Sequence, residues 1–194
     1  MNATPMTVLR FEEKYFERLW GGDKLKSLFD KDVPEGKPIG EAWLIADHRV
    51  HESIIAEGPH QGKTLRQLLE TDPERILGTR PQLTFQGRFP LLLKILDAHE
   101  VLSVQVHPDD AYARHLGEDD VGKTEMWHVL QADANSELIC GLAPSVTPEA
   151  FTRAVADGSI EDLMVRLPAR EGMSVFVPAG MVHAAGRGVV LVEI

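Results

Sequence analysis

Several features that mark whole classes of protein are scarce or missing in this 194-residue chain. It holds a single cysteine, Cys140, so no internal disulfide can form. Cys140 lies in an apolar run, which favours a buried thiol over a nucleophile. No stretch is rich in Lys or Arg, and the formal net charge is −10. These two facts argue against nucleic acid and anionic membranes as partners. An anionic metabolite would need a local cationic pocket.

Long apolar stretches and a signal-like N-terminus are also missing, which argues against a membrane span and favours the cytoplasm. The chain shows no internal repeat and no low-complexity segment. Its length is sufficient for one domain with a substantial core. We therefore expect a single domain over residues 1–194.

Short apolar and alternating runs are frequent, and they predict strands. We expect these strands at 42–46, 53–57, 89–98, 101–106, 126–132 and 137–142, and in the closing runs SVFVPAG, MVHAAG and GVVLVEI. The run at 89–98 fits a strand buried on both faces. The segments 126–132 and 137–142 are a plausible strand pair, and GVVLVEI fits an interior strand.

Helix signals are few and mark short segments. Thr64 with Gln67 predicts a capping box, and Pro73 begins a second short helix that ends before Gly78. Asp109 or Asp110 caps a helix that stops at Gly117. The last two helices begin at Thr147-Pro148 and at Ser159. Regular βαβ alternation is missing, so we predict a mostly β fold: a jelly-roll β-sandwich or small barrel with helical decorations.

Possible metal ligands occur in three motifs: SVQVHPDD, GKTEMW and VPAGMVHAAG. Gln105 and His107 are two residues apart on a predicted strand, so their side chains share one face, together with Ser103. Glu125 begins the next strand, and His183 follows a Gly-containing turn. Imidazole and carboxylate groups are zinc ligands, and catalytic zinc keeps one position open. We therefore expect one divalent metal, with zinc as the first choice and Gln105 as the weakest ligand.

The same ligand types also suit Fe(II), Mn and Ni, so the residues do not fix the metal. Either histidine alone also fits a hydrogen-bonded core residue, and only the three segments together favour a metal site. The other histidines lie among charged or turn residues, or beside a Trp, and are expected at the surface or in packing. Lys94 between apolar residues predicts a structural ion pair with Asp97 or a nearby acid. Lys123 would lie at the rim of the metal site.

The segments FPLLLKILDAHEVLSVQVHPDD, GKTEMWHVL and VFVPAGMVHAAGRGVVLVEI resemble type I mannose-6-phosphate isomerases, and the early motifs RLWGG and GEAWLIADH do so as well. The resemblance extends over nearly the whole chain and is to the compact bacterial form. It implies a cupin fold and a zinc site made by Gln105, His107, Glu125 and His183.

The resemblance further implies that Ser103 helps to hold the substrate phosphate and that Lys123 lines the active site. Glu193 matches an acidic residue that assists proton transfer in the family. The family pattern continues beyond Ile194 with residues that include an active-site arginine. We therefore expect the C-terminal part of that pattern to be missing, with metal affinity kept and isomerisation poor.

The implied reaction interconverts mannose 6-phosphate and fructose 6-phosphate, with a proton moving between C2 and C1 through an enediol. It needs a base near these carbons, and both Glu193 and Lys123 are candidates. Two rival hypotheses remain: a non-catalytic cupin module that binds sugar phosphates, and a metal-dependent cupin enzyme of another class, such as an Fe(II) oxygenase. The implied phosphate contact of Ser103 and the lysine of GKTE argue against the oxygenase.

Overall fold

The computed structural model describes residues 8–79, 87–117 and 120–194. Eleven strands dominate this part of the chain. They are β1 (Lys14–Gly22), β2 (Ile39–Ile45), β3 (Asp47–His48), β4 (His51–Glu52), β5 (Leu93–Ala98), β6 (Glu125–Ala132), β7 (Glu137–Leu142), β8 (Met164–Pro168), β9 (Ser174–Val177), β10 (His183–Ala185) and β11 (Val189–Glu193). All the strand pairs that join them are antiparallel.

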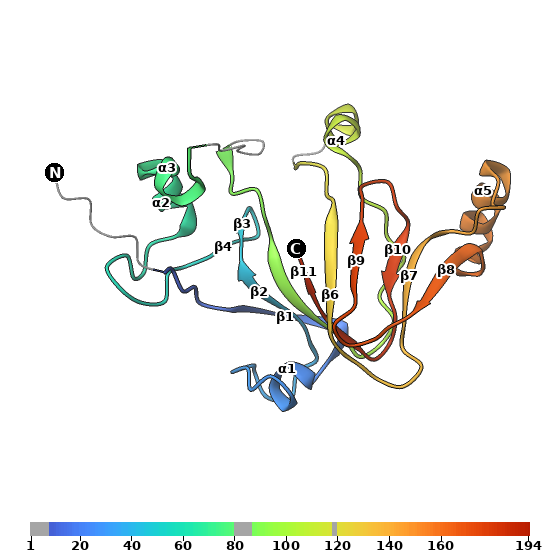
Figure 1. Ribbon diagram of the computed structural model, residues 1–194, viewed down its shortest axis with the longest axis horizontal. Coiled ribbons are helices and arrows are strands. Elements are labelled where there is room, and N and C mark those ends of the chain that lie inside the picture. Colours follow the sequence, from blue (N-terminus) through green and yellow to red (C-terminus); the bar gives the residue numbers. More distant parts are fainter. Residues whose placement is uncertain (1–7, 80–86, 118–119) are drawn as a thin grey trace.

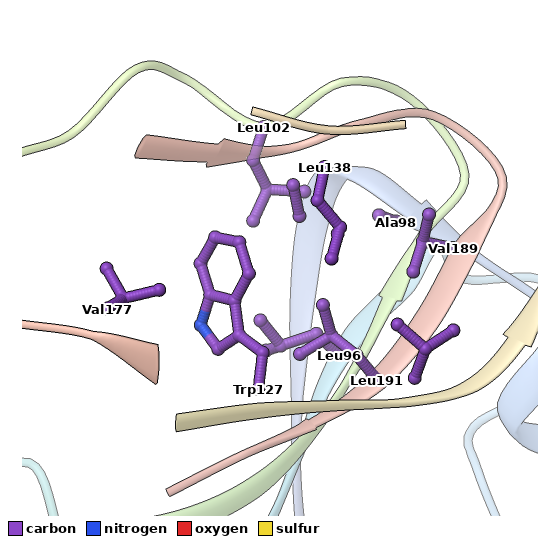
Figure 2. Packing of buried hydrophobic residues seen from close by; sticks show 10 residues of the cluster. Leu96, Ala98, Leu102, Trp127, Leu138, Val177, Val189 and Leu191 are labelled. Carbon is purple, nitrogen blue, oxygen red and sulfur yellow. The ribbon is translucent and has the colours of Figure 1, made fainter. Parts of the chain in front are cut away.

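The strands form a six-stranded sheet in the order β1-β2-β5-β11-β6-β9, a three-stranded sheet in the order β10-β7-β8, and the β3–β4 hairpin. The two larger sheets pack against each other through one apolar cluster. Leu96, Trp127 and Leu191 come from the first sheet, and Leu138 and Ala185 come from the second. Figure 2 shows the side chains at the centre of this cluster. The predicted β-sandwich of cupin type is confirmed.

The helices are short and lie around the sheets. They are α1 (Lys24–Ser27), α2 (Leu65–Thr71), α3 (Pro73–Leu77), α4 (Asp110–Leu116), α5 (Pro148–Asp157) and the 3₁₀ turn η2 (Ile160–Leu163). Figure 1 shows α2 and α3 at one end of the molecule and α5 at the other. No helix in the described part of the chain has the length and apolarity to cross a membrane.

Helix ends that depend on local chemistry lie where the sequence predicted them. Thr64 and Gln67 form the reciprocal capping box of α2, and Pro73 begins α3. The Asp109 side chain accepts a hydrogen bond from Tyr112 N–H at the start of α4. The Thr147 side chain accepts one from Ala150 N–H at the start of α5. Ser159 precedes η2 but makes no capping hydrogen bond with its side chain.

Strand predictions that depended on apolar runs alone were less accurate. The expected strand at 53–57 is reduced to isolated bridges at Ile54 and Ile55. The run at 89–98 becomes a strand only from Leu93. In 101–106, only Gln105 forms a bridge, and its partner is His183. In these stretches only some apolar residues are buried, such as Ile55 and Leu102, whereas Leu91, Val101 and Val106 are exposed. An apolar run alone therefore does not supply the neighbouring strand that a ladder of hydrogen bonds requires.

The expected pair of 126–132 with 137–142 is also wrong. These segments are β6 and β7, but β6 pairs with β11 and β9, whereas β7 pairs with β10 and β8. The chain changes sheets between them, which leaves β11 between β5 and β6. The prediction that GVVLVEI is an interior strand is confirmed.

Candidate metal centre and adjoining cavity

The three motifs meet because backbone hydrogen bonds join them. Gln105 and His183 exchange two N–H to C=O bonds of 2.9 Å each. Gly180 N–H donates to the His107 carbonyl at 2.8 Å, and Lys123 N–H donates to the Pro108 carbonyl at 3.0 Å. The segments that carry the imidazoles and the carboxylate are therefore held by main-chain bonds.

Gly122 is required where the GKTE segment passes the start of α4. A Cβ on Gly122 would lie 2.3 Å from the Asp109 carbonyl carbon, closer than any real contact. The Gly122 N–H donates to the Asp110 carboxylate at 2.9 Å. This close approach sets the position from which Lys123 and Glu125 extend.

His107, Glu125 and His183 form a cluster whose possible ligand atoms all lie within 4.8 Å of one another. We call this group the His–Glu–His cluster. His107 Nε2 lies 3.1 Å from Glu125 Oε1, and His183 Nε2 lies 3.7 Å from Glu125 Oε2. Glu125 and His183 are 2% exposed, whereas the His107 side chain is 22% exposed, so the cluster is buried except on the His107 side.

Hydrogen bonds prepare His183 as a ligand. Its Nδ1 lies 2.8 Å from the Met181 carbonyl oxygen. Since a carbonyl only accepts, Nδ1 must carry the proton, which leaves the Nε2 lone pair directed to the cluster. Burial is the main cause that lowers the pKa of His183, and the nearby charges of His107 and Lys123 act in the same direction. The neutral imidazole, which is the form that binds metals, is therefore favoured.

An unsatisfied atom in the cluster tests whether its residues fit a metal. His107 Nε2 is buried and makes no hydrogen bond of acceptable geometry, although Glu125 Oε1 is near. Buried polar atoms normally have a partner, and an orphan needs an explanation. A divalent cation bound by two imidazoles and a carboxylate supplies that partner and matches the ligand chemistry of zinc. The residues therefore fit a divalent metal.

Glu125 is held by groups around its carboxylate. The Trp127 indole N–H donates to Oε2 at 2.9 Å, and the Lys123 ammonium donates to Oε1. Burial raises the pKa of Glu125, but contacts with His107 and Lys123 outweigh it, so the pKa is lowered overall. The carboxylate is therefore ionised. Trp127 also meets the His183 ring edge-on, with ring centroids 5.4 Å apart. Trp127 is therefore both a buried core residue and a contact of two members of the cluster.

A cavity of about 130 Å³ adjoins this cluster. Its wall contains cationic and carboxylate side chains, together with Gln105, His183 and several apolar side chains. The lining residues are Arg18, Trp20, Glu41, Lys94, Leu96, Leu102, Gln105, Lys123, Glu125, Trp127, His183, Ala185 and Glu193.

Lys123 and Glu193 both line the cavity beside the cluster. The Lys123 ammonium donates to Glu193 Oε1 at 2.8 Å as well as to Glu125. Burial lowers the pKa of Lys123, but the charges of Glu193 and Glu125 outweigh it and raise the pKa. Lys123 therefore keeps its proton. Gln105 also lines the cavity, whereas Ser103 is exposed and is not among the lining residues. The structure thus brings Lys123 and Glu193 next to the His–Glu–His cluster, whereas Ser103 lies apart from them.

Sequence reasoning missed the cavity residues Arg18 and Glu41. The predicted ion pair of Lys94 with a nearby acid is confirmed, but Asp97, the acid named first, is not its partner. Lys94 pairs with Glu193 at 2.9 Å and lies 4.0 Å from Glu41. Asp97 instead accepts a hydrogen bond from the Lys24 backbone N–H. Lys94 and Asp97 are three residues apart in one strand and therefore point to opposite faces.

A pattern that occurs twice in the sequence could have indicated that the Glu41 carboxylate is buried. Glu41-Ala-Trp43 in β2 matches Glu125-Met-Trp127 in β6. In each, the indole N–H donates to the carboxylate two residues earlier, at 2.6 Å in β2 and 2.9 Å in β6. Residues two apart in a strand share a face, so the pattern fixes a buried carboxylate. Both carboxylates line the same cavity.

Comparisons with known proteins agree with this geometry. A family model described as "Phosphomannose isomerase type I, catalytic domain" matches residues 8–138. The Bacillus subtilis protein named "Probable mannose-6-phosphate isomerase GmuF" is 40% identical over 187 residues, which are 96% of this chain and 57% of that protein. The mannose-6-phosphate isomerase of Streptococcus mutans is 36% identical over 186 residues, covering 95% of this chain and 56% of its own length.

A solved structure also matches. The crystal structure of the mannose 6-phosphate isomerase from Bacillus subtilis gives a TM-score of 0.86 at 34% sequence identity, covering 95% of this chain and 57% of that one. The chain therefore spans a little more than half the length of the relatives that it matches.

Proposed function

This chain belongs to the type I phosphomannose isomerase family, and we propose that it interconverts mannose 6-phosphate and fructose 6-phosphate with a divalent metal in the His–Glu–His cluster. The observation that carries this proposal is the position of two proton-handling groups beside three metal-ligand candidates. Lys123 and Glu193 contact each other at 2.8 Å, and Lys123 also contacts Glu125. An aldose–ketose isomerisation needs this combination of an electrophile and a base.

The charge of the cavity supports an anionic substrate. Arg18, Lys94 and Lys123 face the carboxylates of Glu41, Glu125 and Glu193, so the side chains balance one another. A bound divalent cation leaves an excess of about two positive charges, which matches a phosphate group of about −1.5 to −2 at neutral pH. In a chain with a net charge of −10, this cavity is the local cationic pocket that a sugar phosphate requires.

We assign the base to Glu193 rather than to Lys123. The Lys123 ammonium lies between two carboxylates, which hold its proton, so it has no free lone pair. Glu193 lines the cavity without belonging to the cluster, and its carboxylate has acceptor capacity to take a proton from C2 and return it to C1. The protonated Lys123 would donate a hydrogen bond to the oxygen that gains negative charge in the enediol.

The metal would be held by His107, Glu125 and His183, with Gln105 as a further oxygen ligand from the cavity wall. When bound, it supplies Lewis-acid stabilisation of the substrate oxygen, which contributes several kcal/mol. We propose zinc, because two imidazoles and one carboxylate with an open position are typical of catalytic zinc. Trp127 and the Met181 carbonyl would orient these ligands through Glu125 and His183.

A coupled assay of fructose 6-phosphate formation from mannose 6-phosphate tests the proposal. The assay is run on zinc-loaded protein, on protein stripped with a chelator, and on stripped protein reloaded with zinc. We expect turnover that is lost on stripping and restored on reloading. Binding of mannose 6-phosphate without turnover would instead support a non-catalytic binding module. Turnover unaffected by stripping would contradict a role for the metal.

A further inference from the structure

Arg18 is a charged cavity residue to which the proposed reaction assigns no chemical role. It lies on β1, an edge strand of the six-stranded sheet, and three strands separate β1 from β6, which carries Glu125. Its side chain is 37% exposed although it lines the cavity. Lys94 and Lys123 are more buried, at 12% and 34%, and each lies within 4.0 Å of two carboxylates.

Three neighbours fix the guanidinium group of Arg18. Its Nε donates to Glu41 Oε1 at 2.6 Å, and its Nη1 donates to the Glu17 carbonyl at 3.2 Å. The Phe16 ring lies beneath it, with 5.3 Å between Cζ and the ring centroid. Glu41 is in turn fixed by the Trp43 indole. An arginine held in this way loses little rotamer freedom when it binds a ligand.

One nitrogen of the fixed guanidinium remains available. Among the described residues, Nη2 has no hydrogen-bond partner, because Nε and Nη1 make all the hydrogen bonds of this side chain. A guanidinium with free N–H groups at the wall of a cavity suits a phosphate, whose oxygens accept such bonds in a planar, charge-assisted geometry.

Distance along the sheet agrees with a substrate that spans the cavity. Arg18 binds Glu41 of β2, and β5 and β11 separate β2 from β6. Three strand spacings of about 4.8 Å give ~14 Å on a flat sheet and less on a curved one. The side chains of Arg18 and of the His–Glu–His cluster shorten this backbone gap from its two ends. An open-chain hexose 6-phosphate with its first carbons at the cluster would span the remaining distance with its phosphate.

We infer that Arg18 binds the phosphate group of the substrate, oriented by Glu41 and Trp43. This inference rests on the proposed function for the identity of the sugar, but the anion site itself does not depend on turnover. Inorganic phosphate is therefore the probe, and its binding to the zinc-loaded protein is measured by calorimetry.

Arg18→Gln removes the charge and is expected to weaken phosphate binding by roughly ten- to hundredfold, the range for a charge-assisted hydrogen bond. In the isomerase assay, KM for mannose 6-phosphate should rise by a similar factor with kcat nearly unchanged, since the contact is equal in ground and transition states. Arg10→Gln is the matched control, because Arg10 forms an exposed 3.3 Å ion pair with Glu57. Its phosphate affinity and its KM for mannose 6-phosphate should stay as in the wild type.

The outcomes separate this inference from the proposed function. Phosphate binding that is equal in the wild type and Arg18→Gln, or missing from the wild type, overturns the role of Arg18 even if isomerisation is observed. Weakened phosphate binding without any isomerisation would support the anion site and count against the proposed reaction. If Arg18→Gln does not fold, Arg18→Lys keeps the charge beside Glu41 but loses the planar fork. It should still weaken phosphate binding several-fold, and unchanged binding there also overturns the inference.

Discussion

Lys94 and Glu193 are direct partners on the neighbouring strands β5 and β11, and their side chains form a 2.9 Å ion pair on the cavity wall. The register continues on both sides, with Trp43 opposite Lys94 and Trp127 opposite Glu193. One row across four strands therefore contains the central ion pair and the two indoles that hold Glu41 and Glu125. This row joins the metal end of the cavity to the Arg18 end.

The Lys94–Glu193 pair should be energetically coupled, because its members are only 12% and 6% exposed. Lys94→Met, Glu193→Gln and the double variant form a double-mutant cycle, measured by chemical denaturation. We expect a coupling of about 0.5–3 kcal/mol in the free energy of unfolding. If the effect of the double variant equals the sum of the two single effects within about 0.5 kcal/mol, the two side chains are not coupled.

Trp127→Phe should weaken metal binding, because it removes the indole N–H from Glu125 while keeping an aromatic ring in the core. Loss of such an outer hydrogen bond typically lowers metal affinity about 10- to 100-fold. Competition with a chelator measures it. Trp43→Phe is the matched control, since its indole holds Glu41, which lies outside the His–Glu–His cluster. Equal losses in both variants would assign the effect to general destabilisation.

Glu41 should make the fold sensitive to acid. Burial raises its pKa, but Lys94 first, and then Arg18 and Trp43, outweigh this and lower the pKa below the ordinary value of 4.5. The unfolded state therefore takes up this proton at higher pH than the folded state does. The stability that Glu41 contributes is present above about pH 4.5 and is lost as the pH falls through the folded-state pKa.

Denaturation curves between pH 7 and pH 3 test this contribution. Glu41→Gln cannot titrate, so its free energy of unfolding should fall less steeply below about pH 4.5 than that of the wild type. The same slope in both proteins would mean that Glu41 is not held in its charged form.

Lys123→Ala should impair catalysis without removing the metal. Lys123 contacts Glu193 and Glu125 but is not itself a metal-ligand candidate. Loss of one preorganised charge-stabilising group typically costs roughly 10²–10³ in rate. The coupled assay and elemental analysis of the same samples measure the two effects. Lys26→Ala is the control, since Lys26 forms an exposed ion pair with Glu35. Normal turnover by Lys123→Ala would show that Lys123 has no part in catalysis.

The features that the sequence predicted correctly depend on short-range chemistry or on motifs. The capping box at Thr64 and the proline start at Pro73 are set by residues within one helical turn. The structure also brings together His107, Glu125 and His183, which come from three distinctive motifs. Their role as metal ligands stays a prediction.

The features that could not be predicted depend on which strands become neighbours. Lys94 meets Glu193 because β11 inserts between β5 and β6, almost a hundred residues later in the chain. No local pattern around Lys94 specifies that partner. The position of Arg18 in the cavity could not be predicted for the same reason, because it depends on the place of β1 at the edge of the sheet. Glu41 is different, because its Glu-x-Trp pattern repeats that of Glu125 and could have been noticed.

The zinc content of the purified, zinc-loaded protein tests most directly whether the His–Glu–His cluster binds a divalent metal. The wild type should hold about one zinc per chain, as expected for a single site. His107→Ala removes the ligand whose Nε2 lacks a partner and should lose that zinc. His128→Ala should keep it, because His128 hydrogen-bonds to Ser174 outside the cluster. Equal zinc content in the wild type and His107→Ala would show that the His–Glu–His cluster is not the metal site.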